Sequence, residues 1–313
     1  MKNARKPSLT GKSVALAALL VLAALALPHA HAQANGQKTF SSSKEAVETF
    51  IQAAREGNTS DLLSILGQGT EEVISSSDSV ADKTRRERFL ARYDVKHSLT
   101  ESAPQQLSLN IGKDGWPFPI PLVHANDKWY WDGAAGKQEI LYRRIGDNEL
   151  AAIDVCKGAV AAQRDYAAAG HDGLPAGIYA QRLVSEPGKQ DGLYWEVNEG
   201  EIPSPAGPLL AQASSEGYGG SQKGSPYHGY YYRLLKAQGT NAKGGAKSYI
   251  VDGNMSGGFA FIAYPADYRS SGVMTFLVNE NGKIYQKDLG EKTVDLAQQM
   301  TEYNPDNSWK VAK

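Results

Sequence analysis

The stretch 148-NELAAIDVCKGAVAAQRDYAAA-169 decides how the rest of the chain is divided. Its apolar residues recur at helical spacing in two neighbouring stripes, one made of Leu150, Ile153, Cys156 and Val160 and the other of Ala151, Val155, Ala159, Ala162 and Tyr166. This spacing predicts a long helix from Asn148 to Ala169. Asp147 or Asn148 is expected to cap its start, and Gly170 with Gly173 to end it. Two stripes are typical of a helix that a sheet covers over a wide arc, so we expect a structural spine.

The chain before this helix changes from helical to extended patterns. A capping box at Ser42 and Glu45 opens a first predicted helix, and two more helices are predicted at residues 61–66 and 82–93. Alternating apolar residues then predict a half-buried strand from Leu107 to Ile111.

Two extended segments follow, at residues 118–124 and 128–132. Ala125, Asn126 and Asp127 are expected to form the hairpin loop between them. Because prolines interrupt the first segment, it is predicted to be an edge strand or an irregular stretch.

The chain after the long helix consists mainly of short apolar runs between turn residues. Seven strands are predicted, at residues 178–183, 192–197, 230–235, 246–251, 259–264, 273–278 and 284–289. Asn281-Gly282 favours a hairpin between the last two strands. Residues 202–229 predict a long loop, and residues 293–303 a closing helix. The run of tyrosines at 230–232 is therefore interpreted as a strand.

These patterns together predict an α+β fold. N-terminal helices and a curved antiparallel sheet come first, followed by a long helix packed against a mostly antiparallel meander sheet. The predicted division is a signal peptide at residues 1–32, a small α+β domain at 33–142 and a second domain at 143–313.

The first 32 residues are typical of an export signal. A basic start precedes an uninterrupted apolar run from Val14 to Leu27, and Ala30-His31-Ala32 has the small-x-small pattern of a cleavage site. We therefore expect a periplasmic or secreted protein. No later apolar run is long enough to span a bilayer, so no integral membrane segment is expected after cleavage.

Charge and cysteine content exclude several classes of protein. The chain has 33 basic and 34 acidic residues, and removing residues 1–32 leaves 29 and 34, so nucleic acid is not an expected partner. The densest basic run, Lys83 to Arg88, is interrupted by Glu87 and predicts a solvated helix face. Cys156 is the only cysteine; it is predicted to be a buried, inert thiol.

The sequence contains no recognised motif for catalysis or metal binding. His97, His124, His171 and His228 are too dispersed for a zinc site, and no phosphate loop or dinucleotide motif occurs, so neither metal nor cofactor is expected. His228 together with Asp191 or Glu216 remains a possible acid–base pair. A second polar group, Glu139, Arg143, Arg144 and Asp147, predicts an ion-pair network near the domain junction.

The ordered blocks "GWPFPIPLV", "RRIGDNELAAID", "GIYAQ", "DGLYW", "YHGYYYRLLKAQG", "GGAKSYIVDG", "SGVMTF" and "YQKDLG" resemble the bacterial exported family known as domain of unknown function 2950. That resemblance covers almost the whole chain after the signal and implies no activity. The N-terminal half, through its order of elements and "DKWYWD", is similar to the cone-shaped nuclear-transport-factor-2-like domains. The C-terminal half, through "HGYYYRLL", "GGFAFIAYPADY" and "SGVMTFLVNENGKIY", resembles type IV pilin-like globular heads, without their N-terminal filament helix.

The favoured function is an exported envelope module without enzymatic activity that binds a protein or a small ligand. Aromatic and histidine side chains are the expected contacts: Trp116, Trp129, Trp131, Tyr194, Trp195, His228, Tyr230 and Tyr232. A metal-independent hydrolase or sugar-active enzyme using carboxylates of residues 202–229 is the alternative. A pilus-associated subunit that assembles through the long helix is a further alternative.

Overall fold

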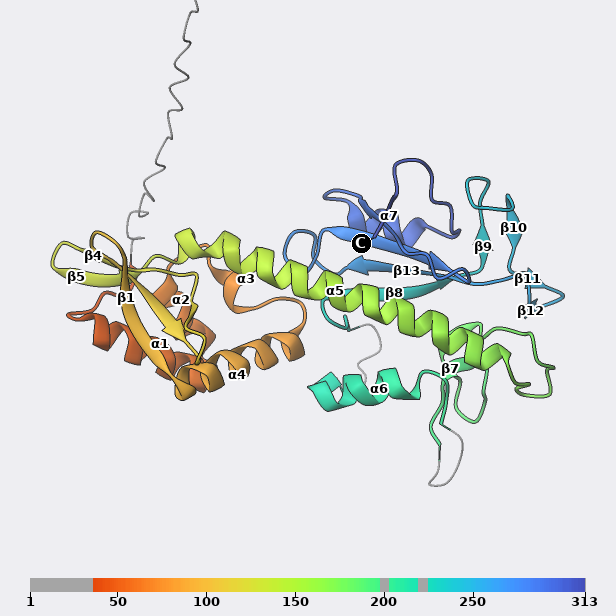
Figure 1. Cartoon of the computed structure of the whole chain (residues 1–313), viewed down its shortest axis with the longest axis horizontal. Coiled ribbons are helices and arrows are strands. Elements are labelled where there is room, and N and C mark those ends of the chain that lie inside the picture. The colour runs from red at the N-terminus through yellow and green to blue at the C-terminus, as the bar shows by residue number, and fades with distance from the viewer. Residues whose placement is uncertain (1–35, 198–202, 219–224, 313) are drawn as a thin grey trace, which may run out of the picture. The chain divides into compact units, whose positions relative to one another are not determined.

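The protein is described by a computed structural model that covers residues 36–197, 203–218 and 225–312 (Figure 1). The predicted signal peptide at 1–32 lies outside the described residues, as does part of the predicted loop at 202–229. The α+β class is confirmed, with a long helix and an antiparallel sheet in the C-terminal part. In the described part of the chain, no helix is both long and apolar enough to cross a bilayer.

Four helices open the chain: α1 Ser43–Glu56, α2 Thr59–Leu66, α3 Glu71–Ile74 and α4 Ser79–Val95. The predicted cap of α1 is confirmed, because Ser42 Oγ accepts a hydrogen bond from Glu45 N at 3.1 Å. Helix α4 begins earlier than its predicted start at Asp82. The reason is the buried carboxylate of Asp78, which accepts a hydrogen bond from Ala81 N at 2.9 Å and caps the helix there.

A five-stranded antiparallel sheet follows these helices, made of β1 His97–Ala103, β2 Gln106–Ile111, β3 Trp116–Pro117, β4 Leu122–Ala125 and β5 Lys128–Trp131. The predicted hairpin is present. Asn126 and Asp127 form its turn with φ of 51° and 57°, the geometry of a two-residue type I′ turn. The segment 118–124 was predicted to be an edge strand or an irregular stretch, and its first half is irregular, because its prolines cannot donate to a ladder and β4 starts only at Leu122. Strand β1 was not predicted, since it is mostly exposed and lacks an apolar alternation.

The first hydrophobic core lies between this sheet and the helices α1, α2 and α4. We call it the N-terminal core, and its fully buried members include Phe40, Ile65, Leu109, Ile111, Ile120, Leu122 and Trp131. Trp131 shows why the sheet and α1 are fixed to each other. Its ring packs 5.1 Å from that of Phe50 and its indole N–H donates to Ala46 O at 3.2 Å, so a buried polar group is satisfied.

The long helix α5 runs from Gly133 to Ala167. It therefore begins fifteen residues before the predicted start, and the predicted cap at Asp147 or Asn148 is wrong. The true N-cap is Asp132, whose side chain accepts from Ala135 N at 3.0 Å. The helix is continuous across position 142, where the division between the two domains was predicted; that division stays a prediction.

A second antiparallel sheet packs with the C-terminal half of α5. Its strands lie in the order β16 Lys310–Val311, β15 Tyr285–Asp288, β14 Met274–Asn279, β13 Ala260–Pro265 and β8 Tyr230–Leu235. All six residues of β13 are buried, and both α5 and the closing helix α7, Thr293–Gln299, pack against this strand. The interpretation of the tyrosine run as a strand is confirmed. The remaining ladders are short, and β6 Arg182–Val184 pairs with β7 Gly192–Tyr194 in parallel.

The predicted loop at 202–229 contains helical structure. Helix α6, Gly207–Ala213, continues into a π-helical turn at Ser214–Tyr218. The predicted strand at 246–251 is divided between two ladders, in which β10 Lys247–Ser248 pairs with β9 Ala237–Gln238 and β11 Ile250–Val251 pairs with β12 Asn254–Met255. The apolar content of the sequence therefore did not predict the secondary structure of these two segments correctly.

The second hydrophobic core, the C-terminal core, is formed by α5, α7 and the strands of the second sheet. Its fully buried aromatic side chains are Tyr230, Tyr249, Phe259, Phe261 and Phe276. Cys156 belongs to this core with an exposure of 1%. Burial raises the pKa of its thiol to about 12, so the predicted buried thiol is confirmed.

Candidate functional site

A cavity of about 700 Å³ opens beside the N-terminal core. Side chains of the helices α1 to α4, of residues 140–150 of α5 and of the segment around β3 form its walls. Its volume lies within the range of small-molecule sites in proteins. This cavity is the candidate functional site.

The floor of the cavity is aromatic. The ring of Phe89 lies 5.9 Å from that of Phe50 and 5.1 Å from that of Phe118. Phe50 is buried, whereas Phe89 and Phe118 are half-buried and face the cavity. Half-buried aromatic rings retain apolar surface that a ligand can cover.

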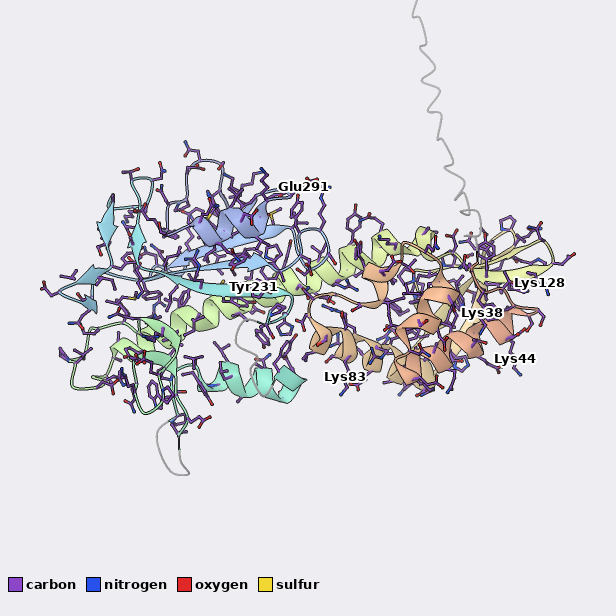
Figure 2. All side chains as sticks on the ribbon, turned by 180° about the vertical axis from the view of Figure 1, so that it is seen from behind. Lys38, Lys44, Lys83, Lys128, Tyr231 and Glu291 are labelled. Atoms are coloured by element: carbon purple, nitrogen blue, oxygen red, sulfur yellow. The ribbon has the colours of Figure 1, made fainter. Side chains whose placement is uncertain are left out.

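The rim of the cavity is positively charged. Its charged lining residues are the arginines Arg85, Arg86, Arg88, Arg92, Arg143 and Arg144 and the aspartates Asp82, Asp114 and Asp147, a formal excess of three positive charges. All basic lining residues are arginines. The lysines Lys38, Lys44, Lys83 and Lys128 are exposed and do not line the cavity (Figure 2). Arginine presents a planar fork of N–H groups that matches carboxylates, which lysine does not.

Trp116 lies next to two of these arginines. The Arg143 guanidinium lies 4.7 Å from the centre of the Trp116 ring and that of Arg92 lies 6.0 Å away. Each arginine is also held by a carboxylate, because Arg143 Nε donates to Glu139 at 2.7 Å and Arg92 Nη2 to Asp114 at 2.6 Å. The guanidinium groups are therefore held in place by these contacts.

Three lining arginines keep a buried N–H without an acceptor. Among the described residues, no hydrogen-bond partner is found for Arg92 Nε, Arg143 Nη1 or Arg144 Nε, although each of these atoms is shielded from the surface. An unsatisfied buried donor costs about 1–3 kcal/mol. Such donors are expected where a ligand supplies the acceptor.

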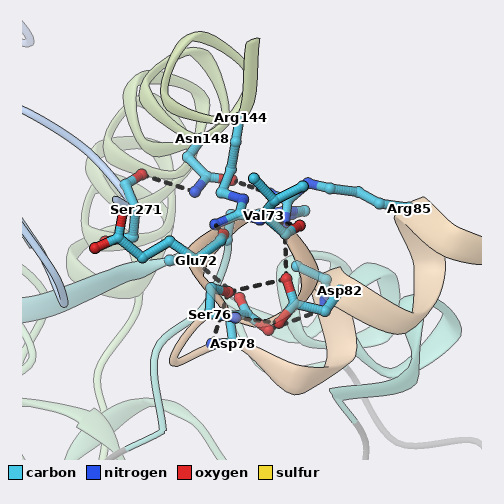
Figure 3. Close-up of polar contacts among 12 residues, drawn as sticks. Glu72, Val73, Ser76, Asp78, Asp82, Arg85, Arg144, Asn148 and Ser271 are labelled. Carbon is cyan, nitrogen blue, oxygen red and sulfur yellow. Dashed lines mark hydrogen bonds and ion pairs between the residues drawn. The ribbon is translucent and has the colours of Figure 1, made fainter. Parts of the chain in front are cut away.

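Arg144 is the most deeply buried of these cations, with an exposure of 4%. It donates to the carbonyl oxygens of Glu72 and Val73 at 2.6 and 3.0 Å, which fixes the end of α3 (Figure 3). Burial lowers the pKa of its guanidinium. A negative charge near the Arg144 guanidinium would stabilise this buried cation in its charged form.

Asn148 and Arg85 continue this polar network. Arg85 Nη2 donates to Asn148 Oδ1 at 2.6 Å, and Asn148 Nδ2 donates to Ser271 O at 2.7 Å (Figure 3). Asn148, which lies in the middle of α5, thus links α4 to the loop between β13 and β14 through hydrogen bonds.

A second polar group surrounds the turn before β8. His228 Nε2 lies 3.0 Å from Glu216 Oε2, and Tyr227 OH donates to the same oxygen at 3.3 Å. Of the two carboxylates considered from the sequence, Glu216 is thus the partner of His228. The φ of 50° at His228 belongs to a two-residue turn with Gly229.

Asp78 anchors this group to α4. Besides capping α4, it accepts from Tyr218 OH at 2.7 Å and from Gly229 N at 2.9 Å. Three donors satisfy this buried carboxylate. Among the described residues, no cluster of three His, Cys, Asp or Glu side chains is arranged to hold a metal ion.

The eight contact residues expected from the sequence do not lie together in the structure. Trp116 lines the cavity. Trp131 and Tyr230 are fully buried members of the two cores. The others are half-buried elsewhere: Trp129 beside His124, Trp195 beside His171, Tyr194 in β7, Tyr232 in β8 and His228 beside Glu216.

Sequence reasoning assigned Arg143 and Arg144 to an ion-pair network, of which the Arg143–Glu139 pair is present at 2.7 Å. It missed the four arginines of α4 that line the cavity, and Phe89 and Phe118 as cavity residues. The run from Lys83 to Arg88 was predicted to be a solvated face, which is correct for Lys83, Glu87 and Arg88, whereas Arg85 and Arg86 are half-buried. Arg85, Arg86 and Arg88 line the cavity together with Phe89. The available signal was a helix that carries arginines next to aromatic residues.

The chain matches the family described as "Protein of unknown function (DUF2950)" over residues 37–312. Because this match covers most of the chain, the chain belongs to that family. No curated protein and no solved structure matches it. The likenesses to nuclear-transport-factor-2-like domains and to pilin heads are not confirmed by any match and stay predictions.

Proposed function

We propose that this protein is an exported, non-enzymatic binding module that holds a small organic ligand with an apolar body in the cavity beside the N-terminal core. The observation that carries this proposal is the aromatic floor of Phe89 and Phe118 in a space of about 700 Å³. A ligand that covers such rings gains about 25 cal/mol for each Å² of apolar surface removed from water. Export rests on the sequence of residues 1–32 alone.

A thermal-shift screen of small apolar compounds tests this proposal, with one substitution that narrows the cavity. Gly146 lines the cavity on α5, and a Cβ atom there meets no heavy atom within 4 Å. Gly146→Leu is therefore expected to weaken binding about ten-fold or more without lowering the melting temperature. Lys157→Leu, at an exposed position of the same helix, is the matched control. Unchanged affinity in Gly146→Leu would place the ligand outside the cavity and refute the proposal.

The hydrolase alternative has one observation in its favour. Glu216 is placed to orient the imidazole of His228, as in a general acid–base pair. Assays of the purified protein on ester and glycoside substrates test it, with His228→Gln as the variant. This alternative requires a turnover that His228→Gln lowers at least 100-fold; equal rates in both proteins refute it.

A further inference from the structure

We infer that the ligand of the cavity carries a carboxylate group next to its apolar body, and that Arg92 and Arg143, which both lie next to Trp116, bind this group. This inference rests on the proposed function and deepens it, because it names the chemical class of the ligand. Three observations support it independently of one another.

The first observation is the charge of the lining. Six arginines face only three aspartates, and several of these charges are shielded from bulk water. Positive charges gathered in a partly buried space repel one another, and this repulsion is relieved by an anion. The chain as a whole has no such excess, with 33 basic and 34 acidic residues.

The second observation is the set of unused donors. Arg92 Nε and Arg143 Nη1 are buried, line the same cavity, and have no acceptor among the described residues. Arg144, which is 96% buried, has a third such donor at Nε. The acceptor that satisfies donors of this kind best is a charged oxygen, and each such bond is about twice as strong as a neutral one.

The third observation is the way Trp116 positions the two guanidinium groups. Stacking at 4.7 Å for Arg143 and 6.0 Å for Arg92 leaves the in-plane N–H groups available for a ligand. Glu139 and Asp114 each occupy one edge of these arginines. A planar carboxylate fits the edges that remain, while its apolar body extends over Phe89 and Phe118.

The test compares isosteric pairs that differ only in charge: decanoate with decanamide, and 2-naphthoate with 2-naphthamide. Dissociation constants are measured by isothermal titration calorimetry on the purified protein. We expect each carboxylate to bind about ten-fold or more tightly than its amide, a difference of about 1.4 kcal/mol. Added salt should weaken binding of the carboxylates and leave that of the amides unchanged.

Substitutions assign this preference to residues. In Arg143→Gln and Arg92→Gln, the carboxylate-to-amide preference should fall to about three-fold or less, while the amide affinity stays within about two-fold. Both side chains are 37% exposed, so the fold is expected to tolerate these changes. Arg269→Gln is the matched control, because Arg269 is exposed and lies 5.3 Å from the Tyr268 ring outside the cavity.

The outcomes separate this inference from the proposed function. Equal affinity for a carboxylate and its amide, or a preference that survives both substitutions together, overturns the inference and leaves the binding module intact. Absence of binding by all four compounds overturns both. Carboxylate preference that is lost with Arg143→Gln and retained with Arg269→Gln supports both.

Discussion

The two hydrophobic cores of this protein are built from similar residues and differ in how completely they close. In the C-terminal core, β13 is buried along its whole length, and Phe259, Phe261 and Phe276 are inaccessible. In the N-terminal core, Trp131 is equally inaccessible, yet Phe89 and Phe118 at its border remain half-buried beside a large cavity. The difference between the cores is therefore one of packing at a border, which a count of aromatic residues does not reveal.

Buried polar atoms without a partner occur in both parts of the described chain, and they differ in kind. Asn148 and Gln163, which are buried on α5 near the C-terminal core, have both their amide nitrogen and oxygen bonded. Elsewhere in the C-terminal part, no partner is found among the described residues for Ser204 Oγ, Arg233 Nε, Thr275 Oγ1 and Glu280 Oε2, and none of these residues lines the cavity. The three unsatisfied atoms beside the N-terminal core all belong to arginines of one cavity, an arrangement that an anion would satisfy.

The largest expected effect tests whether the C-terminal core is closed. Phe261→Ala removes a ring that is 2% exposed, so the free energy of unfolding should fall by about 3–5 kcal/mol. Phe89→Ala, at the cavity, should cost only about 1–2 kcal/mol and should weaken ligand binding. Urea denaturation measures both values. Equal costs for the two substitutions would contradict the distinction between the cores.

Alkaline pH should test the closure of the C-terminal core, through groups whose pKa burial raises. Cys156 and Tyr166, both in the C-terminal core, have pKa values of about 12. Their folded-state pKa exceeds the unfolded value, so the stability they contribute is complete below about pH 9 and is lost as the pH rises toward 12.

The loss attributed to Cys156 should be on the order of 2 kcal/mol by about pH 11. Cys156→Ala should therefore flatten the dependence of the unfolding free energy on pH between about 9 and 11, whatever its effect at neutral pH. Urea titrations across that range measure the slope. Identical slopes in the variant and the parent protein would show that the thiol is not buried as described.

The smallest effects concern two glycines of α5. A Cβ atom at Gly136 meets Ile120 atoms at 2.5 and 2.7 Å, so Gly136→Ala should destabilise the protein by about 1–3 kcal/mol. Gly146→Ala has open space and should stabilise it by about 0.5–1 kcal/mol, because alanine is the better helix former. Thermal unfolding compares them. A stabilising effect of Gly136→Ala would mean that α5 does not pack on Ile120 as described.

The elements that were predicted well are those whose signals are local. The cap at Ser42 and the apolar runs of β8, β13, β14 and β15 place these elements to within one or two residues. Strand β1 and the first part of α5 lack such signals. The glycines at 133, 136 and 146 favour a loop, whereas in the structure Asp132 caps a helix there and Gly136 packs closely on Ile120.

The cavity could not be predicted from the sequence because its signals are not local either. It brings together Arg92 of α4, Trp116 of β3 and Arg143 of α5, which are distant in sequence. Trp116 was expected to be a contact residue because it is aromatic, and so were Trp131 and Tyr230, which are in the cores. Whether an aromatic residue lies in a core or lines a cavity depends on tertiary packing, which residue type does not encode.

The most direct test of this account is to observe all five tryptophan side chains while a ligand binds. Each indole N–H gives a separate NMR signal in ¹⁵N-labelled protein, which Trp→Phe substitutions assign. Addition of decanoate should shift the signal of Trp116 strongly and leave those of Trp195 and Trp309 unchanged, since neither lines the cavity. A shift of Trp195 or Trp309 with no shift of Trp116 would contradict the account, because the ligand would then bind at the C-terminal core.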